Sequence, residues 1–248
     1  RTRGRVGVPA VIRIPSFGGI KGKEHHGESP ETYYVHTAGL KVVVPSSPLD
    51  AYRLLRLSID DPDPVIFLEP KSRYWSKETG DPTSDGPGIG RARTVRDGGS
   101  CVVIAYGAMV TRCLEAAEVL SAEDIEVSVL DLRSLVPLYV EAMGEAVRAT
   151  GRAVVVHEAP LTLGMGAEVV ARIVELAFDH LEAPVRRVTG SARVTVPERL
   201  ITSKALYGRK IKVNTPTHII AALEFASGPI GTLVTTFDVG LHHTPRFE

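Results

Sequence analysis

Two adjacent histidines, His25 and His26, are the residues of this chain best suited to moving a proton. They stand in a Gly-rich segment that reads SFGGIKGKEHHGESPE. An imidazole titrates near neutral pH, so it can both donate and accept a proton in general acid–base catalysis. Neighbouring side chains on one backbone diverge, which makes the pair a poor metal site. The alternative interpretation is two solvated loop histidines.

A second polar set, Ser58, Asp61 and Asp63, falls at the end of a predicted helix in the run SIDDPDP. Hydroxyl and carboxylate oxygens are hard donors that can hold a cation. Pro62 and Pro64 support an acidic turn without any bound ion equally well. Both interpretations stay open.

His157 and Glu158, in VVVHEAP, follow a predicted strand. The ends of strands are where α/β folds place their sites, although we expect a structural or interface role here rather than catalysis. Gly164 and Gly166 precede a predicted helix whose N-terminus could receive a phosphate.

The elements that must position these residues alternate between strand and helix, which predicts parallel sheets built from βαβ units. In the first region, strands are expected at 10–14, 41–44 and 65–68, with a helix at 49–59 that Ser47 or Asp50 could cap. In the second, we expect strands at 101–105, 125–130 and 153–156, and helices at 109–120, 140–149 and 167–181.

The remaining segments differ in character. The run SKETGDPTSDGPGIG has the composition of a surface connection, and its glycines are not preceded by a strand, so we predict a linker rather than a dinucleotide loop. After about residue 187, short β-rich runs and turns predict antiparallel strands. Arg73, Tyr74 and Trp75 are expected to pack at the domain junction, and Tyr33, Tyr34 and His36 to pack or to contact a partner.

Composition narrows the class of protein. Lys plus Arg and Asp plus Glu are equal at 29 each, so no global field favours nucleic acid or an anionic membrane. No apolar run reaches the roughly 18 residues needed to span a bilayer, and two cysteines do not make a disulfide framework. We expect a cytoplasmic protein with reduced thiols, or its equivalent in the mitochondrial matrix after processing.

Several of these motifs together resemble a known family. PSFGGIKGKEHHGESPETYYVHTAGLKVVVP, GPGIGRARTVRDGGSCVVIAYGAMV and TGRAVVVHEAP look like the beta subunit of the decarboxylating component of branched-chain 2-oxo acid dehydrogenase. That family is thiamine-diphosphate dependent and transketolase-like. The resemblance covers residues 1 to about 184, and implies a truncated pyrimidine-binding domain at 1–75, a linker at 76–100, and a three-layer α/β C-terminal domain at 101–186.

The resemblance also implies roles for residues. His26 would reach the thiamine thiazolium and support proton transfer, although Gly27 stands where the family usually has a serine. Ser58, Asp61 and Asp63, with backbone carbonyls from the strand around Val8, Ala10 and Val11, would bind potassium. The alpha subunit would hold the diphosphate and its magnesium. The acidic residue on the pyrimidine side of the cofactor would lie upstream of Arg1.

The tail, 187–248, is similar instead to the sheet domain of the glucose–fructose oxidoreductase and inositol dehydrogenase family. The segments RRVTGSARVTVPERLITSK and KIKVNTPTHIIAALEFASGPIGTLVTTFDV carry this likeness. Neither the Rossmann domain nor the Glu-Lys-Pro motif of that family is present. We therefore expect a chimera with its junction between residues 184 and 190.

These observations predict a beta-type subunit for oxidative decarboxylation of a branched-chain 2-oxo acid, with acyl transfer to a lipoyl group. Expected partners are an alpha subunit and a second beta subunit in a heterotetramer, and a dihydrolipoyl acyltransferase core. The isolated chain is expected to be inactive. The alternatives are a non-catalytic assembly fragment, a pyruvate dehydrogenase beta subunit, or an NAD-dependent sugar oxidoreductase fragment.

Overall fold

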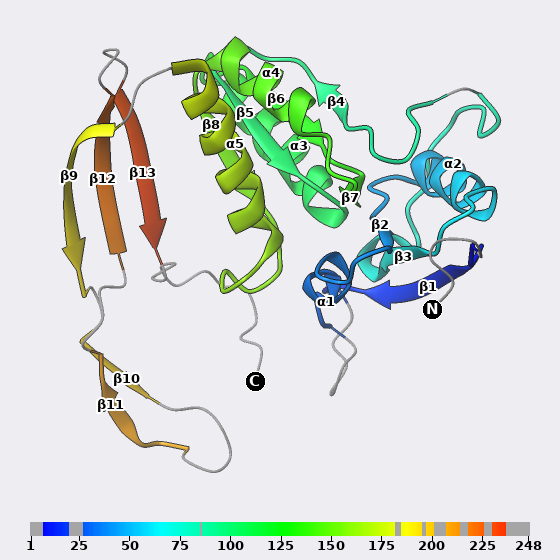
Figure 1. Ribbon diagram of the computed structural model, residues 1–248, viewed down its shortest axis with the longest axis horizontal. Helices are drawn as coiled ribbons and strands as arrows, with labels where there is room; N and C mark the ends of the chain where they lie inside the picture. Colours follow the sequence, from blue (N-terminus) through cyan, green and yellow to red (C-terminus); the bar gives the residue numbers. More distant parts are fainter. Residues whose placement is uncertain are drawn as a thin grey trace. The chain divides into compact units, whose positions relative to one another are not determined.

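The computed structural model describes residues 7–19, 27–84, 86–181, 185–194, 197–200, 207–213, 218–225 and 230–236. The chain divides into two compact units, Arg1–Leu176 and Ala177–Glu248. Each unit is built around its own sheets (Figure 1).

The first unit contains two four-stranded sheets, each mostly parallel. One has the order β1-β3-β2-β7, and the other has the order β4-β6-β5-β8. The bounds of the strands are β1 Val11–Ser16, β2 Lys41–Val43, β3 Val65–Pro70, β4 Arg93–Arg96, β5 Cys101–Ala105, β6 Val127–Asp131, β7 Ser134–Val136 and β8 Ala153–Val156.

Helices cover these sheets in the expected α/β alternation, which is confirmed. Their bounds are α1 Glu31–Val35, α2 Pro48–Ile59, α3 Ala108–Ser121, α4 Val140–Thr150 and α5 Met165–Leu181, with a short 3₁₀ turn, η1, at Lys71–Arg73. The start of α2 follows from its sequence, because Ser47 caps the helix by accepting the Asp50 N–H, and Pro48 occupies the first turn.

Alternate residues of the central strand β5 face different layers, which makes the second sheet the middle of three. Ala105 packs with Val110 of α3 on one side. Ile104 packs with Met143 of α4 and Val169 of α5 on the other. This second core also contains Phe17, Val42, Val44, Ile66 and Leu68 from the first sheet, so the two sheets of the unit share one buried interior.

Three short elements depart from the sequence expectations. Strand β4 lies inside the predicted linker and pairs antiparallel with β6. Helix α1 was not expected. Strand β7 follows β6 in the chain but pairs antiparallel with β2 of the other sheet. Edge and crossover strands of three or four residues carry too little periodicity to be separated from loops.

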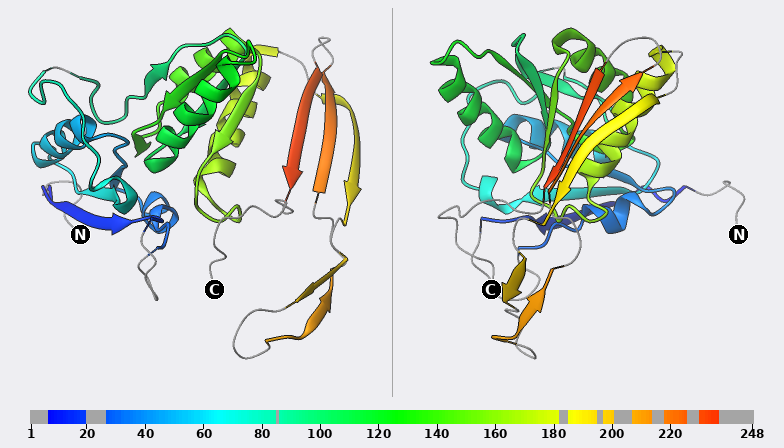
Figure 2. Two further views of the ribbon diagram at one scale, coloured as in Figure 1. Left: turned by 180° about the vertical axis from the view of Figure 1, so that it is seen from behind. Right: turned by 90° about the vertical axis from the view of Figure 1, so that its left-hand side faces the viewer.

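The second unit is antiparallel, as its sequence indicates. Figure 2 shows its three-stranded sheet, of order β13-β12-β9, and a separate β10–β11 ribbon. The bounds are β9 Val185–Arg193, β10 Glu198–Leu200, β11 Lys210–Lys212, β12 His218–Phe225 and β13 Ile230–Thr236.

Candidate functional site

The backbone closes a loop at the C-terminal end of β1. The Phe17 N–H donates to the Glu28 carbonyl at 2.7 Å, which holds together the two ends of the segment that carries His25 and His26. Phe17 and Gly19 both have positive φ, at 68° and 102°. His25 and His26 themselves lie outside the described residues, so the predicted role of His26 stays a prediction.

A buried glutamate lies beneath this turn. Glu31, the first residue of α1, is 0% exposed, and its Oε1 accepts a 2.6 Å hydrogen bond from the Tyr106 hydroxyl. Its other oxygen, Oε2, is also buried, and no described residue donates a hydrogen bond to it. A carboxyl oxygen left in this way is a costly arrangement if the group is ionised.

Two more ionisable groups come from the end of β8. Glu158, half-buried, accepts the Gly18 N–H on Oε2 at 3.2 Å. The His157 ring stacks on Tyr106 with centroids 6.3 Å apart and ring planes 9° apart. We call Glu31, Tyr106, His157 and Glu158 the Tyr106 cluster.

Glycines determine where the imidazole of His157 lies. A Cβ at Gly164 would come within 2.9 Å of the ring, and one at Gly166 within 2.3 Å. The turn that the sequence offered as a phosphate site is therefore filled by the His157 side chain.

Burial keeps the Tyr106 cluster towards its uncharged forms. It raises the pKa of Glu31, which the Tyr106 hydrogen bond only partly opposes. Burial also raises the pKa of Glu158; the Gly18 N–H and the Lys71 ammonium oppose this rise, whereas Glu31 adds to it. The pKa of the Tyr106 phenol is raised and that of His157 lowered, both mainly by burial. The cluster can thus hold a proton close to the strand ends.

The predicted cation corner is arranged differently. The Asp61 carboxylate accepts two hydrogen bonds from the Lys41 ammonium, at 2.7 and 2.8 Å, and Asp63 contacts the same ammonium at 3.2 Å. The Ser58 hydroxyl donates into its own helix, to the Leu54 carbonyl. The Ala10 carbonyl already accepts the Val65 N–H. These contacts favour the acidic-turn interpretation, and a potassium ion here stays a prediction.

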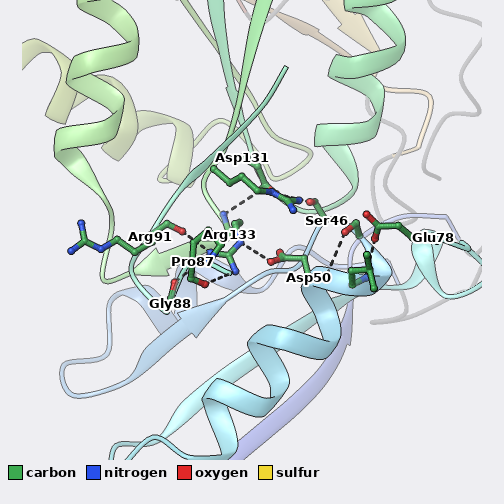
Figure 3. A network of polar contacts seen from close by, with 11 residues as sticks. Ser46, Asp50, Glu78, Pro87, Gly88, Arg91, Asp131 and Arg133 are labelled. Atoms are coloured by element: carbon green, nitrogen blue, oxygen red, sulfur yellow. Dashed lines mark hydrogen bonds and ion pairs between the residues drawn. The ribbon is translucent and has the colours of Figure 1, made fainter. Parts of the chain in front are cut away.

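A second buried network joins the two sheets of the first unit (Figure 3). The Arg133 side chain, fully buried, donates to Asp50 at 2.6 Å. Asp131 accepts the Ser46 hydroxyl at 2.5 Å, and lies 3.7 Å from the Arg93 guanidinium. We call these residues the Arg133 network.

The Arg133 network also fixes the predicted linker. The guanidinium donates to three linker carbonyls, those of Pro87, Gly88 and Arg91. Burial raises the pKa of Asp131 to about 7, with the negative charge of Asp50 adding to the effect and Ser46 and the arginines opposing it. A linker held at several carbonyls by one buried cation is an ordered part of the unit.

The aromatic–basic residues after β3 differ from expectation in one respect. Trp75 is 92% exposed, so the prediction that it packs at the domain junction is wrong. Its neighbour Tyr74, which is also exposed, donates from its hydroxyl to Glu69 in β3 at 2.7 Å. Of the other expected packing residues, Tyr34 is half-buried against the core, whereas Tyr33 is 76% exposed.

Sequence reasoning placed His157 and Glu158 at a strand end but missed Glu31, Tyr106 and Arg133. Tyr106 directly follows β5, so the rule that sites gather at strand ends could have found it. No local signal marks Glu31, whose partner is 75 residues away. Within the part of the chain that the structure describes, no three His, Cys, Asp or Glu side chains are grouped to hold a metal. None of the described helices has the length and apolar character to cross a membrane.

Comparisons with known proteins agree with this architecture. Residues 1–76 match the transketolase pyrimidine-binding domain, and residues 90–208 match the transketolase C-terminal domain. A split-gene transketolase described as an inactive beta4 tetramer superposes with a TM-score of 0.59 at 23% identity, over 70% of this chain and 57% of that one. At that identity the likeness concerns the fold alone.

Sequence relatives are dehydrogenase beta subunits. The 3-methyl-2-oxobutanoate dehydrogenase subunit beta of Mycobacterium tuberculosis is 49% identical over 81% of this chain and 58% of its own length. The 2-oxoisovalerate dehydrogenase subunit beta of Pseudomonas aeruginosa is 40% identical over 77% and 58%. The pyruvate dehydrogenase E1 component subunit beta of Leifsonia xyli is 44% identical over 81% and 59%. The chain thus spans less than two thirds of the length of these relatives.

Proposed function

Because the chain carries a transketolase-type pyrimidine-binding domain followed by a transketolase-type C-terminal domain, we propose that it acts as the beta-type part of a thiamine-diphosphate-dependent 2-oxo acid dehydrogenase. The reaction would be oxidative decarboxylation of a branched-chain 2-oxo acid, with transfer of the acyl group to a lipoyl group. The main support is the 49% identity to a 3-methyl-2-oxobutanoate dehydrogenase beta subunit. A pyruvate-using variant is the close alternative, given the 44% identity to a pyruvate dehydrogenase beta subunit.

The described residues are better suited to supporting the surroundings of the cofactor than to binding its diphosphate directly. The imidazole of His157 fills the glycine turn at Gly164 and Gly166, where a diphosphate could otherwise have bound. We therefore place the diphosphate and its magnesium with an alpha subunit. Thiamine diphosphate, when bound, would supply the electron sink that decarboxylation needs.

In this proposal His26 moves a proton and the residues below it hold its loop in place. The bond between Phe17 and Glu28 closes the loop at its stem. Glu158 fixes the following amide, that of Gly18. A turn anchored at two successive residues limits where the loop histidine can reach, which is what a proton-transfer group requires.

The partners proposed are an alpha subunit, a second beta subunit in a heterotetramer, and a dihydrolipoyl acyltransferase core in the cytoplasm. The experiment mixes the chain with the alpha subunit of a related dehydrogenase, thiamine diphosphate and magnesium. It measures decarboxylation of 3-methyl-2-oxobutanoate and of pyruvate. Turnover that requires both proteins supports the proposal, and the preferred substrate separates the two variants. A complex without turnover would favour the non-catalytic assembly fragment, and the absence of both would contradict the proposal.

Two finer proposals remain beside this one. Potassium at Ser58, Asp61 and Asp63 would have to displace the Lys41 ammonium, so the melting temperature should rise in potassium chloride relative to sodium chloride only if the ion binds.

For the tail, we propose an origin in the glucose–fructose oxidoreductase group, supported by its antiparallel strands. Strand β9 lies inside the transketolase match, which ends at 208, and pairs with β12 beyond it. Sequencing of the gene across the junction tests that origin.

A further inference from the structure

The charge state of Glu31 is the unresolved feature of the Tyr106 cluster. Its side chain is fully buried, one oxygen has the Tyr106 hydroxyl as donor, and the other has no donor among the described residues. An ionised carboxylate in water accepts several hydrogen bonds, so a site offering one donor favours the neutral acid.

The surrounding charges point the same way. Among the described residues, the ionisable groups that interact with Glu31 from neighbouring elements are Tyr106 after β5 and Glu158 after β8, and His157 stacks on the phenol ring. Lys71 of η1, itself buried, is the cation that acts on Glu158, and Glu31 and Glu158 repel each other when both are ionised. Glu158 therefore has the better environment for a negative charge.

Glu158 also needs that charge. Its Oε2 accepts the Gly18 N–H at 3.2 Å, and a backbone amide bonds more strongly to a carboxylate than to a neutral acid. Gly18 belongs to the turn with positive φ at Phe17 and Gly19, which needs an anchor to keep this conformation.

We propose that Glu31 and Glu158 hold one proton between them at neutral pH, resident on Glu31, and that the neutral Glu31 allows an ionised Glu158 to position the Phe17–Gly19 turn. Glu31 is then a positioning residue that acts through Glu158. The catalytic meaning of this arrangement rests on the proposed function, because the turn supports the segment that carries His26. The shared proton itself is a property of the buried pair.

The amide of Gly18 offers a direct readout, because its proton chemical shift follows the charge on the carboxylate that it contacts. We expect the amide shift in the wild-type chain to titrate in two steps, the first when Glu158 ionises and the second when Glu31 does. In Glu31→Gln, which keeps the shape of the neutral acid, only the first step should remain. A single wild-type step, identical to that of the variant, would overturn the proposal.

Infrared spectroscopy reports the proton separately. A carboxylic acid absorbs apart from carboxylates, and at pH 7 the wild-type chain should show such absorption, to which Asp131 contributes as well. Glu31→Gln should remove the Glu31 component, which appears as a difference between the two spectra. The matched control is Glu115→Gln, at an exposed glutamate paired with Arg112, and it should leave the band unchanged. If Glu31→Gln has the same carboxylic-acid absorption as the wild type, the proposal is contradicted. If that variant does not fold, the two-step titration of the wild-type Gly18 amide decides.

The outcome is separable from that of the proposed function. Two titration steps without dehydrogenase activity would keep the proton pair and reject the enzyme assignment. Dehydrogenase activity with a single titration step would keep the enzyme assignment and reject the proton pair. If both hold, Glu31→Asp, which withdraws the carboxyl by one methylene, should alter the pH profile of acyl transfer in the assembled enzyme, whereas a purely structural role would lower its rate equally at every pH.

Discussion

The first unit buries two groups of ionisable side chains, and their charges are compensated differently. In the Arg133 network, Asp50 pairs with the guanidinium of Arg133, whereas Asp131 accepts the backbone N–H of Arg133 and lies 3.7 Å from the guanidinium of Arg93. In the Tyr106 cluster, two carboxyl groups face a phenol and a backbone amide, with a lysine beside one of them.

The difference separates a structural joint from a site with adjustable charge. The buried guanidinium of Arg133 pairs with Asp50 and binds linker carbonyls as well, so this pair fixes backbone geometry. The Tyr106 cluster depends on protonation to lower its charge, so its state changes with pH. Asp131, which ends β6 and whose pKa is raised to about 7, shares this pH dependence, so the fixed part of the Arg133 network is the pair of Asp50 and Arg133.

The largest effect should come from removing the cation of the Arg133 network. Arg133→Met leaves the buried Asp50 carboxylate and several carbonyls without their donor. We expect a loss of about 3–5 kcal/mol in the free energy of unfolding, measured by urea titration. The control Arg112→Met, at an exposed ion pair, should change the midpoint little. A midpoint for Arg133→Met close to that of the wild type would show that the network is not the joint described here.

The balance within that network can be tested by pH. The folded-state pKa of Asp131 is raised to about 7 by burial and by Asp50. Its unfolded value is about 3.9, so the stabilising effect of its proton is complete below about pH 4 and is lost as the pH rises towards 7. We expect wild-type stability to fall across this range by on the order of 4 kcal/mol relative to Asp131→Asn. If the stability of the wild type and that of Asp131→Asn change with pH in parallel, the arginines compensate the charge of Asp131 fully.

The Tyr106 cluster should respond to the loss of a single hydroxyl. Tyr106→Phe removes the described donor to Glu31, so we expect a loss of about 1–3 kcal/mol in the free energy of unfolding. The loss should grow as the pH rises through the range in which Glu31 ionises, because the hydrogen bond lowers the pKa of Glu31 and its removal lets that pKa rise further. Tyr33→Phe, at an exposed tyrosine, is the matched control. Equal unfolding curves for both variants would refute the role of the hydroxyl.

The ion pair of Lys41 with Asp61 should show the opposite dependence of stability on pH, and the smallest effect. Burial opposes ionisation of Asp61, but hydrogen bonds from Lys41 and the Asp63 N–H outweigh it and lower its pKa. The stabilisation is therefore present above about pH 3.9 and is lost as the pH falls through the lowered value. Lys41→Met should cost about 0.5–1 kcal/mol at pH 7, and this cost should shrink as the pH falls through the lowered pKa of Asp61. A cost that persists in acid would point to lost packing instead.

The parts of the fold visible in the sequence were those with strong local patterns. The helix at α2 was predictable from Ser47, Pro48 and its apolar face, and the buried strands β5 and β6 from continuous aliphatic runs. Strand β4 was not, because its four residues follow a Gly-rich run and pair only at the sheet edge. Strand β4 belongs to the sheet because it pairs with β6, and the local sequence of β4 gives no sign of that partner.

The candidate site divides in the same way. His157 and Glu158 could be placed because they directly follow a predicted strand. The bond from Tyr106 to Glu31 and the ion pair between Arg133 and Asp50 join residues 75 and 83 positions apart. Such pairs are decided by how the two sheets share an interior, and a single sequence contains no periodic signal for that arrangement.

The pairing of β7 with β2 has a consequence for how this unit could be divided. Residues 134–136 complete the sheet of the N-terminal segment, although the chain reaches them only after building most of the other sheet. A protease cut in the segment between Ser76 and Gly90 would therefore produce two fragments, and the C-terminal fragment would carry the strand that completes the sheet of the N-terminal one. We expect such pieces to remain associated after cleavage and to recombine when mixed, as complementing fragments do, whereas neither should fold as a free-standing domain.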